Sequence, residues 1–137
     1  MQRTKESLPV GKQAQRSELT KRKILEAAEK AFATLGLYGA RIDDIAREAD
    51  VNKRMIYEYF GNKEELYKTV LETVYLRLGE CEAGIVSCSQ EIDAEKAIGS
   101  LVEIYFRFLK DNSIYVKMVM WENLMEARYF DEKGLSG

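Results

Sequence analysis

The sequence predicts an all-α fold. Apolar residues recur every three or four positions along most of the 137 residues, and no stretch shows the two-residue alternation of a half-buried strand. After one longer helix come two short helical segments joined by a tight turn, which is the order of a three-helix helix-turn-helix unit. Further helical segments occupy the rest of the chain.

Residues 1–17 are expected to form a flexible basic arm, because they are polar and hold the chain's only proline, Pro9. The cations of this arm either follow a DNA groove or belong to a solvated tail. A first helix is expected to begin near Ser17, where Glu18 suits the positive end of the helix dipole. Gly36 is placed to end this helix in the left-handed conformation. The apolar face of the helix comprises Ile24, Ala28, Ala31, Phe32 and Leu35.

Two short helices, Ile42–Ala49 and Lys53–Phe60, are predicted to form the helix-turn-helix. The small side chain of Ala46 allows them to cross closely. Asp50 stands where the turn needs a left-handed residue, a conformation that glycine fills best and aspartate tolerates. Asn52 can then cap the second helix.

Residues 18–62 are therefore predicted to form a helix-turn-helix domain, and residues 63–137 a helical regulatory domain. The regulatory domain is expected to start with a long helix, followed by a loop at the polar segment 87–91. The next helix, Ile92–Lys110, is apolar almost all round, which predicts burial on several sides. A last helix is expected over Ile114–Phe130.

The charge distribution favours a polyanionic partner for the first half of the chain. Residues 1–63 hold 13 Lys plus Arg and 9 Asp plus Glu, a balance of +4. Residues 64–137 hold the remaining 8 and 14, a balance of −6, so the total is −2. A basic front half is expected where only that half contacts nucleic acid.

Several other classes of protein are disfavoured. No window approaches the roughly 18 consecutive apolar residues of a membrane span, and no apolar run follows the first charges as in a signal peptide, so a cytoplasmic location is expected. The absence of His removes the commonest general base, and adjacent carboxylates such as Asp43 and Asp44 point about 100° apart on a helix. We therefore expect neither an enzyme nor a cofactor. Cys81 and Cys88 are read as buried or surface thiols, because a metal site would need two more ligands.

The run from Ile42 to Phe60 resembles the signature of the TetR (tetracycline-repressor-like) family. It ends in Tyr57-x-Tyr59-Phe60, and Asn62-Lys63 follows after Gly61. With the helix ahead of it, the resemblance covers about residues 17–78. It implies a homodimeric DNA-binding transcriptional regulator, most often a repressor in this family. Such a regulator is expected to bind a pseudo-palindromic operator in double-stranded DNA and to respond to a small apolar effector.

The resemblance also implies which residues contact DNA. The helix Lys53–Phe60 enters the major groove, so that residues at its leading end reach base edges, while tyrosine hydroxyls and nearby cations hold the backbone. The base-edge residues are Lys53, Arg54 and Met55, and the backbone residues are Tyr57, Tyr59, Lys63 and Arg41. The alternative is that the tyrosines seal a small core and the cations are only solvated. Glu58 either accepts from cytosine N4 or lies unfavourably near phosphate.

Two positions depart from the family pattern. Relatives commonly carry Ser or Thr at the positions of Ala40 and Arg41, where the hydroxyl caps the next helix; the missing cap costs about 1 kcal/mol. Asp50 replaces the usual glycine of the turn and adds a negative charge. These departures, together with Glu58, favour a rival interpretation in which a protein-interaction adaptor keeps the fold without binding DNA.

The downstream half carries no motif, but its aromatic and methionine side chains suit an apolar effector pocket. The pocket candidates are Tyr105, Phe106, Met118, Trp121 and Met125. Plain core is the alternative for each of them, and a DNA-binding protein without an effector is then the second rival. Because relatives usually continue beyond the position of Gly137, the chain is either a truncated form or dimerises in another way.

Overall fold

The structure is a computed structural model that describes residues 10–88, 93–126 and 128–129, with backbone alone for residues 10 and 85–88. The described residues form six helices, which confirms the all-α prediction. None of these helices is both long and apolar enough to cross a membrane.

The first helix, α1 (Val10–Gly39), is longer than predicted. It begins at Val10 rather than near Ser17, so residues 10–17 are helical and the predicted arm is wrong for them, while residues 1–9 lie outside the described residues. The backbone leaves helical geometry at Gly36, with φ of 69° and ψ of −180°, before one more turn. The predicted stop is therefore a kink inside α1.

The two short helices have the predicted bounds. They are α2 (Ile42–Ala49) and α3 (Lys53–Phe60), and the turn between them passes through Asp50 in the left-handed conformation. The backbone N–H of Val51 donates to the carbonyl of Ala46 at 3.0 Å, which closes the turn.

The remaining helices are α4 (Lys63–Cys88), α5 (Ala94–Asp111) and α6 (Ser113–Leu124). Of the loop predicted at 87–91, residues 87 and 88 are the last of α4, and the rest lies outside the described residues. The last helix is shorter than predicted, because the chain turns at Met125 and Glu126. Phe130 lies outside the described residues.

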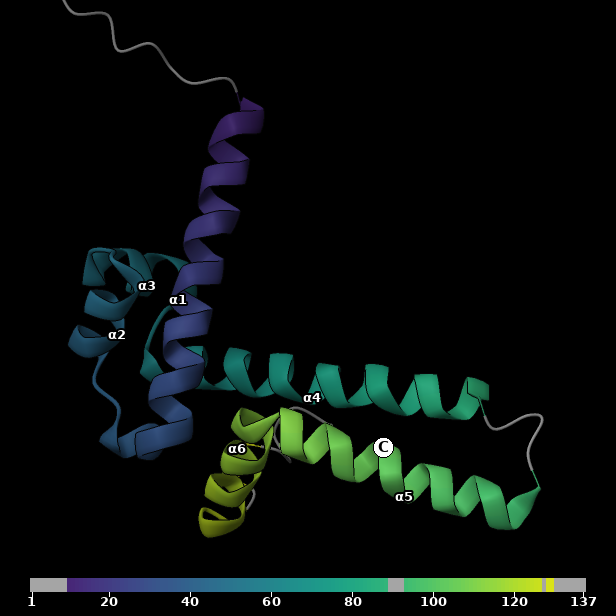
Figure 1. The fold of residues 1–137 in the computed structure, drawn as a ribbon. Helices are drawn as coiled ribbons and strands as arrows, with labels where there is room; N and C mark the ends of the chain where they lie inside the picture. Colours follow the sequence, from purple (N-terminus) through teal and green to yellow (C-terminus); the bar gives the residue numbers. More distant parts are fainter. Residues whose placement is uncertain (1–9, 89–92, 127, 130–137) are drawn as a thin grey trace, which may run out of the picture.

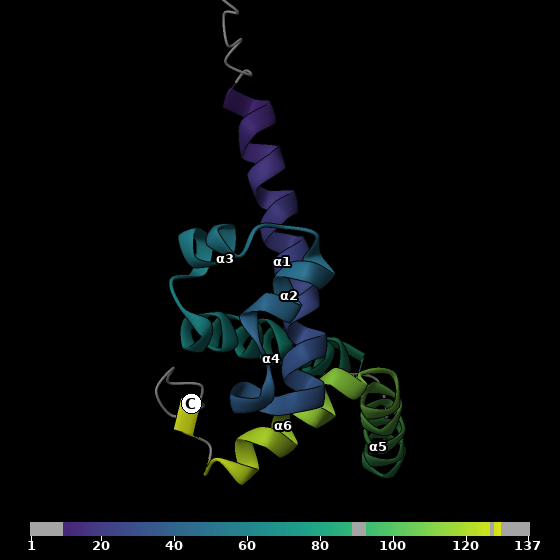
Figure 2. The same cartoon turned by 90° about the vertical axis from the view of Figure 1, so that its left-hand side faces the viewer.

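The helices pack around α1. Figure 1 shows α2 and α3 beside the middle and lower part of α1, with the first turns of α1 projecting beyond α3. In the same view α4 leads away from this group, α5 returns alongside α4, and α6 comes back to the lower end of α1. Figure 2 confirms that α6 lies below α4, next to the end of α1. Helices α4 and α6 therefore contact the helix-turn-helix domain mainly through α1.

One buried cluster joins α1 to the helices around it. Phe32 of α1 and Tyr67 of α4 lie at its centre, with ring centroids 5.1 Å apart in an edge-to-face arrangement. The cluster comprises Ile24, Ala27, Ala28, Phe32, Ala33, Leu37, Ala40, Ile42, Ile45, Ala46, Ala49, Ile56, Leu66, Tyr67, Val70, Leu71, Val74, Met118 and Tyr129. Helices α2 and α3 thus share one core with α4 and α6.

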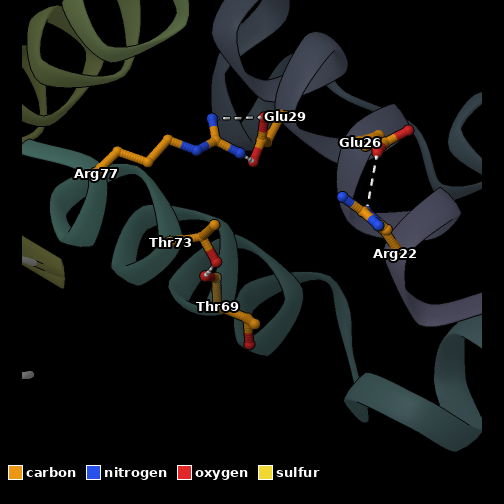
Figure 3. Close-up of polar contacts among 6 residues, drawn as sticks. All are labelled: Arg22, Glu26, Glu29, Thr69, Thr73 and Arg77. Carbon is orange, nitrogen blue, oxygen red and sulfur yellow. Dashed lines mark hydrogen bonds and ion pairs between the residues drawn. The ribbon is translucent and has the colours of Figure 1, made fainter. Parts of the chain in front are cut away.

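An ion pair braces α1 against α4 outside the aromatic centre. Arg77 donates to both carboxylate oxygens of Glu29, at 2.8 and 3.2 Å, as Figure 3 shows. The Glu29 side chain is only 7% exposed, whereas that of Arg77 is 46% exposed. The guanidinium therefore satisfies a buried carboxylate and fixes the spacing of the two helices.

Helix α5 is not buried, which contradicts the prediction from its composition. None of its residues is buried, and Ile98, Val102 and Phe106 are each more than 60% exposed. Among the described residues only α4 and α6 pack closely against it. An apolar pattern indicates which side chains can be covered, but it does not supply the neighbour that covers them.

Candidate nucleic-acid interface

Turn and capping residues define the ends of the helices in the helix-turn-helix. Asp50 has φ of 54° and ψ of 50°, and its backbone N–H closes the end of α2. The Asn52 side chain then accepts from the backbone N–H of Arg54 at 2.9 Å and so caps α3. At the other end, Gly61 takes φ of 91°, and Asn62 accepts from the N–H of Glu65 at 2.9 Å to start α4. Each of these four helix ends thus has a residue that defines it.

Packing then decides which face of α3 turns outward. Ile56 is buried against the core, and Tyr59 and Phe60 are partly buried against the same cluster. The opposite face carries Lys53, Arg54, Tyr57 and Glu58, all exposed. Helix α3 therefore presents two cations, a phenol and a carboxylate to the outside.

A hollow of about 340 Å³ opens beside this outer face, and three cations line it. They are Arg41 before α2, Lys53 at the start of α3, and Lys63 at the start of α4. The other lining residues are Tyr38, Ala40, Ile42, Asp43 and Tyr57. We call this surface the basic hollow. It brings together four of the seven predicted DNA-contact residues, from three separate elements.

Two of the three cations are already bonded inside the basic hollow. The Lys63 ammonium donates to the carbonyl oxygen of Ala40 at 3.0 Å, which ties the start of α4 to the connection before α2. The Lys53 ammonium lies 3.0 Å from a carboxylate oxygen of Asp43 on α2. That hydrogen bond and its charge hold the pKa of Asp43 below its usual value and raise the pKa of Lys53.

The amino end of α2 also faces the basic hollow. Arg41 occupies its cap position in an extended conformation, and its side chain makes no capping hydrogen bond, as the sequence predicts. The first backbone N–H groups of a helix have no partner within the helix. An uncapped helix start beside three cations is an arrangement that suits an anionic oxygen.

The other three predicted contact residues lie outside the basic hollow. Arg54 is exposed on α3, with its Nε 2.9 Å from a carboxylate oxygen of Glu58. Met55 is half-buried. Tyr59 turns toward α1, where the Lys21 ammonium lies 5.5 Å from the centre of its ring.

Two residues of the basic hollow were missed from the sequence. Tyr38, in the last turn of α1, is 71% exposed and lines the hollow. Asp43 is not among the contact residues predicted from the sequence, yet it holds Lys53. No sequence signal identifies either one, because the kink at Gly36 and the crossing of α2 with α3 place them there.

The five predicted pocket residues are scattered. Met118 is fully buried in the core cluster, whereas Phe106 is 72% exposed on α5. Trp121 donates from its indole nitrogen to the carbonyl oxygen of Ala33 at 3.1 Å. Tyr105 donates to Glu82 at 3.2 Å, and Met125 is packed against the core cluster.

A cavity of about 110 Å³ does lie between α4, α5 and α6. It is lined by Val74, Arg77, Phe108, Asp111, Asn112, Ser113, Ile114 and Tyr115, so none of the five predicted pocket residues lines it.

The capped turn, the outward face of α3 and the packing of α2 against α3 define a protein of the helix-turn-helix class. Residues 24–70 match the family model described as "Bacterial regulatory proteins, tetR family". The chain belongs to the TetR family, which confirms the resemblance seen in the sequence.

Two curated proteins and one solved structure illustrate the relationship. The HTH-type transcriptional repressor NicS of Pseudomonas putida is 37% identical over 117 residues, which cover 85% of this chain and 54% of NicS. The HTH-type transcriptional repressor SCO4008 of Streptomyces coelicolor is 56% identical over 61 residues, covering 44% of this chain and 32% of that repressor. A TetR-like transcriptional regulator from Rhodococcus sp. RHA1 shares the fold, with a TM-score of 0.71 at 20% identity over 85% of this chain and 63% of that one. The matched segments thus span about half the length of NicS and a third of the length of SCO4008.

Proposed function

We propose that the protein is a DNA-binding transcriptional repressor that acts as a homodimer on a pseudo-palindromic operator. The observation that carries the proposal is the basic hollow beside the exposed face of α3. In this proposal α3 enters the major groove of double-stranded DNA, and the hollow receives a backbone phosphate. Repression is supported by the two relatives, which are both named as repressors.

The chemistry of the basic hollow suits a phosphate. Three cations and two phenol hydroxyls surround it, and the uncapped start of α2 adds backbone N–H groups. Lys63 can serve two partners, because an ammonium has three donors and the Ala40 carbonyl uses one. Asp43 opposes the positive potential, but it neutralises only one of the three cations.

Phosphate contacts and base contacts predict different mutational effects. Arg41→Ala and Lys63→Ala should weaken binding to every duplex, and each should lower the salt slope of the affinity by about one unit per half-site. Arg54→Ala should instead relax base preference, at about 1–3 kcal/mol for a lost bidentate contact with guanine. Titrations of labelled duplexes at two salt concentrations would measure both effects.

Arg107→Ala, on α5 away from the basic hollow, is the control for a lost positive charge. Because Lys63 also bonds Ala40, its variant is compared with Arg41→Ala, whose side chain makes no hydrogen bond to the described residues. Arg41→Ala and Lys63→Ala variants that bind DNA with the wild-type salt slope would contradict the proposal. A protein that binds no duplex at all would favour the rival adaptor function.

The short length of α3, the helix proposed to contact the bases, supports the dimer. Helix α3 has 8 residues and reaches only a few base pairs, too few for useful specificity alone. Two copies related by a two-fold axis would place two such helices about 34 Å apart, in successive major grooves. We expect sedimentation of the saturated complex to give two chains for each duplex. One chain, protecting a single half-site, would exclude the dimer.

A small apolar effector that lowers operator affinity is part of the same proposal. The cavity between α4, α5 and α6 supports it, because Phe108, Ile114 and Tyr115 line that cavity close to the Glu29–Arg77 brace. By linkage, operator DNA must lower effector affinity by the same factor. Trp121, the only tryptophan, contacts α1 and would report such binding through its fluorescence.

A further inference from the structure

Both cations at the leading end of α3 are held by carboxylates. The Lys53 ammonium lies 3.0 Å from Asp43 of α2, and the Arg54 guanidinium lies 2.9 Å from Glu58, one turn further along α3. Both carboxylates stand on the surface that the proposed function turns toward DNA, although a polyanionic partner would select against negative charge there. Their position on this surface suggests that the two carboxylates have a function in DNA binding.

The two ion pairs can open, because water reaches them. The four side chains are between 53% and 83% exposed, and pairs this exposed contribute little to stability. A DNA group can therefore replace either carboxylate on its cation. The DNA group must then form with the cation a hydrogen bond like the one that the carboxylate made. The displaced carboxylate is left facing the DNA.

A random stretch of DNA makes this exchange unfavourable. A phosphate that takes Lys53 leaves Asp43 without its hydrogen-bonded cation in the basic hollow, close to the polyanion. Near Arg54, a wrong base edge offers no bidentate acceptor, while Glu58 repels the backbone. On a wrong sequence, at least one of the four charged side chains in these two ion pairs is left without a partner. The affinity for that sequence is therefore lower.

A matching base pair satisfies both members of the second ion pair. Guanine presents O6 and N7 to an arginine, and its paired cytosine presents an N4 amino group to a carboxylate. Arg54 and Glu58, side by side and bonded to one another, match these two kinds of group.

We propose that Asp43 and Glu58 are specificity-determining residues, which hold Lys53 and Arg54 away from non-cognate DNA. This inference rests on the proposed function, since it assigns a role within the same interface. It adds that the carboxylates act chiefly by weakening binding to the wrong sequences.

The test compares two duplexes. Selection from a random-sequence pool with the full wild-type chain supplies a preferred duplex, and a scrambled version of it serves as the non-cognate probe. We expect Asp43→Asn and Glu58→Gln each to tighten binding to the scrambled duplex by about two- to fivefold, the range of an exposed ion pair. Binding to the preferred duplex should change less or weaken, so the ratio of the two affinities falls.

The matched control is Glu103→Gln on α5. Glu103 forms the same kind of pair, with Arg107 one turn away at 2.9 Å, and its substitution changes net charge by the same amount. This control should leave the ratio of affinities unchanged. If Asp43→Asn and Glu58→Gln tighten both duplexes equally, or leave both unchanged, the inference is wrong while the proposed function stands. If the wild-type chain enriches no duplex, the proposed function fails, and the inference fails with it.

Discussion

Gly36→Ala is expected to lower the free energy of unfolding by about 3–5 kcal/mol, as measured by denaturant titration. Gly36 has φ of 69° and ψ of −180°, a region of backbone space that is essentially restricted to glycine. A Cβ atom at this position would also lie 2.8 and 2.9 Å from two ring carbons of Trp121. Backbone strain and a steric clash therefore add up at one residue.

The indole ring cannot easily retreat from this contact. Its Nε1 donates to the carbonyl oxygen of Ala33 at 3.1 Å, so the ring is held over the end of α1. Gly61→Ala separates the two causes, because Gly61 has φ of 91° but nothing within 4 Å of its added Cβ. It should lose only the strain, about 1–3 kcal/mol. Equal losses for the two variants would show that Trp121 does not restrict Gly36.

The kink at Gly36 shows what local sequence can predict. A glycine at the end of an apolar helical face predicts a positive φ, and the structure has one. The same holds for the helix-turn-helix, where Asp50, Asn52 and Gly61 fix the ends of α2 and α3 at the predicted residues. These signals act within a few residues, so one sequence is enough to interpret them.

Long-range contacts are where the sequence predictions fail. Trp121 contacts Gly36 and Ala33 of α1, which lie 85 and 88 residues before it in the sequence, and no local pattern predicts this contact. The composition of α5 predicted burial, although the described residues cover little of it. In the candidate interface, the pair of Lys53 with Asp43 depends on how α2 and α3 cross. Local periodicity does not encode which distant side chains meet.

Tyr67→Phe is the second substitution with a large expected effect on stability. The Tyr67 hydroxyl donates to one carboxylate oxygen of Glu122 at 2.6 Å, between α4 and α6. Glu122 is 2% exposed, and its other oxygen has no hydrogen-bond partner among the described residues. Burial, and then this bond, raise the pKa of the Tyr67 hydroxyl well above its usual value, which keeps the donor proton in place.

Removing the hydroxyl would leave a buried carboxylate without its hydrogen bond. We expect a loss of about 2–3 kcal/mol in the free energy of unfolding, in the range of bonds to a charged group. Tyr115→Phe is the control, because the half-buried Tyr115 hydroxyl makes no hydrogen bond to the described residues. It should change stability by well under about 1 kcal/mol.

Glu122→Gln distinguishes the hydrogen bond from the charge. The amide oxygen can still accept from Tyr67 and the negative charge is removed, while the amide nitrogen takes the place of the unpartnered oxygen, so stability should change little. In the Glu122→Gln background, Tyr67→Phe should cost only about 1 kcal/mol, the value of a neutral hydrogen bond. Equal losses for Glu122→Gln and Tyr67→Phe would instead mean that the carboxylate charge is itself stabilised. Because Trp121 and Glu122 are adjacent on α6, the first contacting α1 and the second α4, these substitutions measure how firmly α6 holds the two helices that flank the helix-turn-helix.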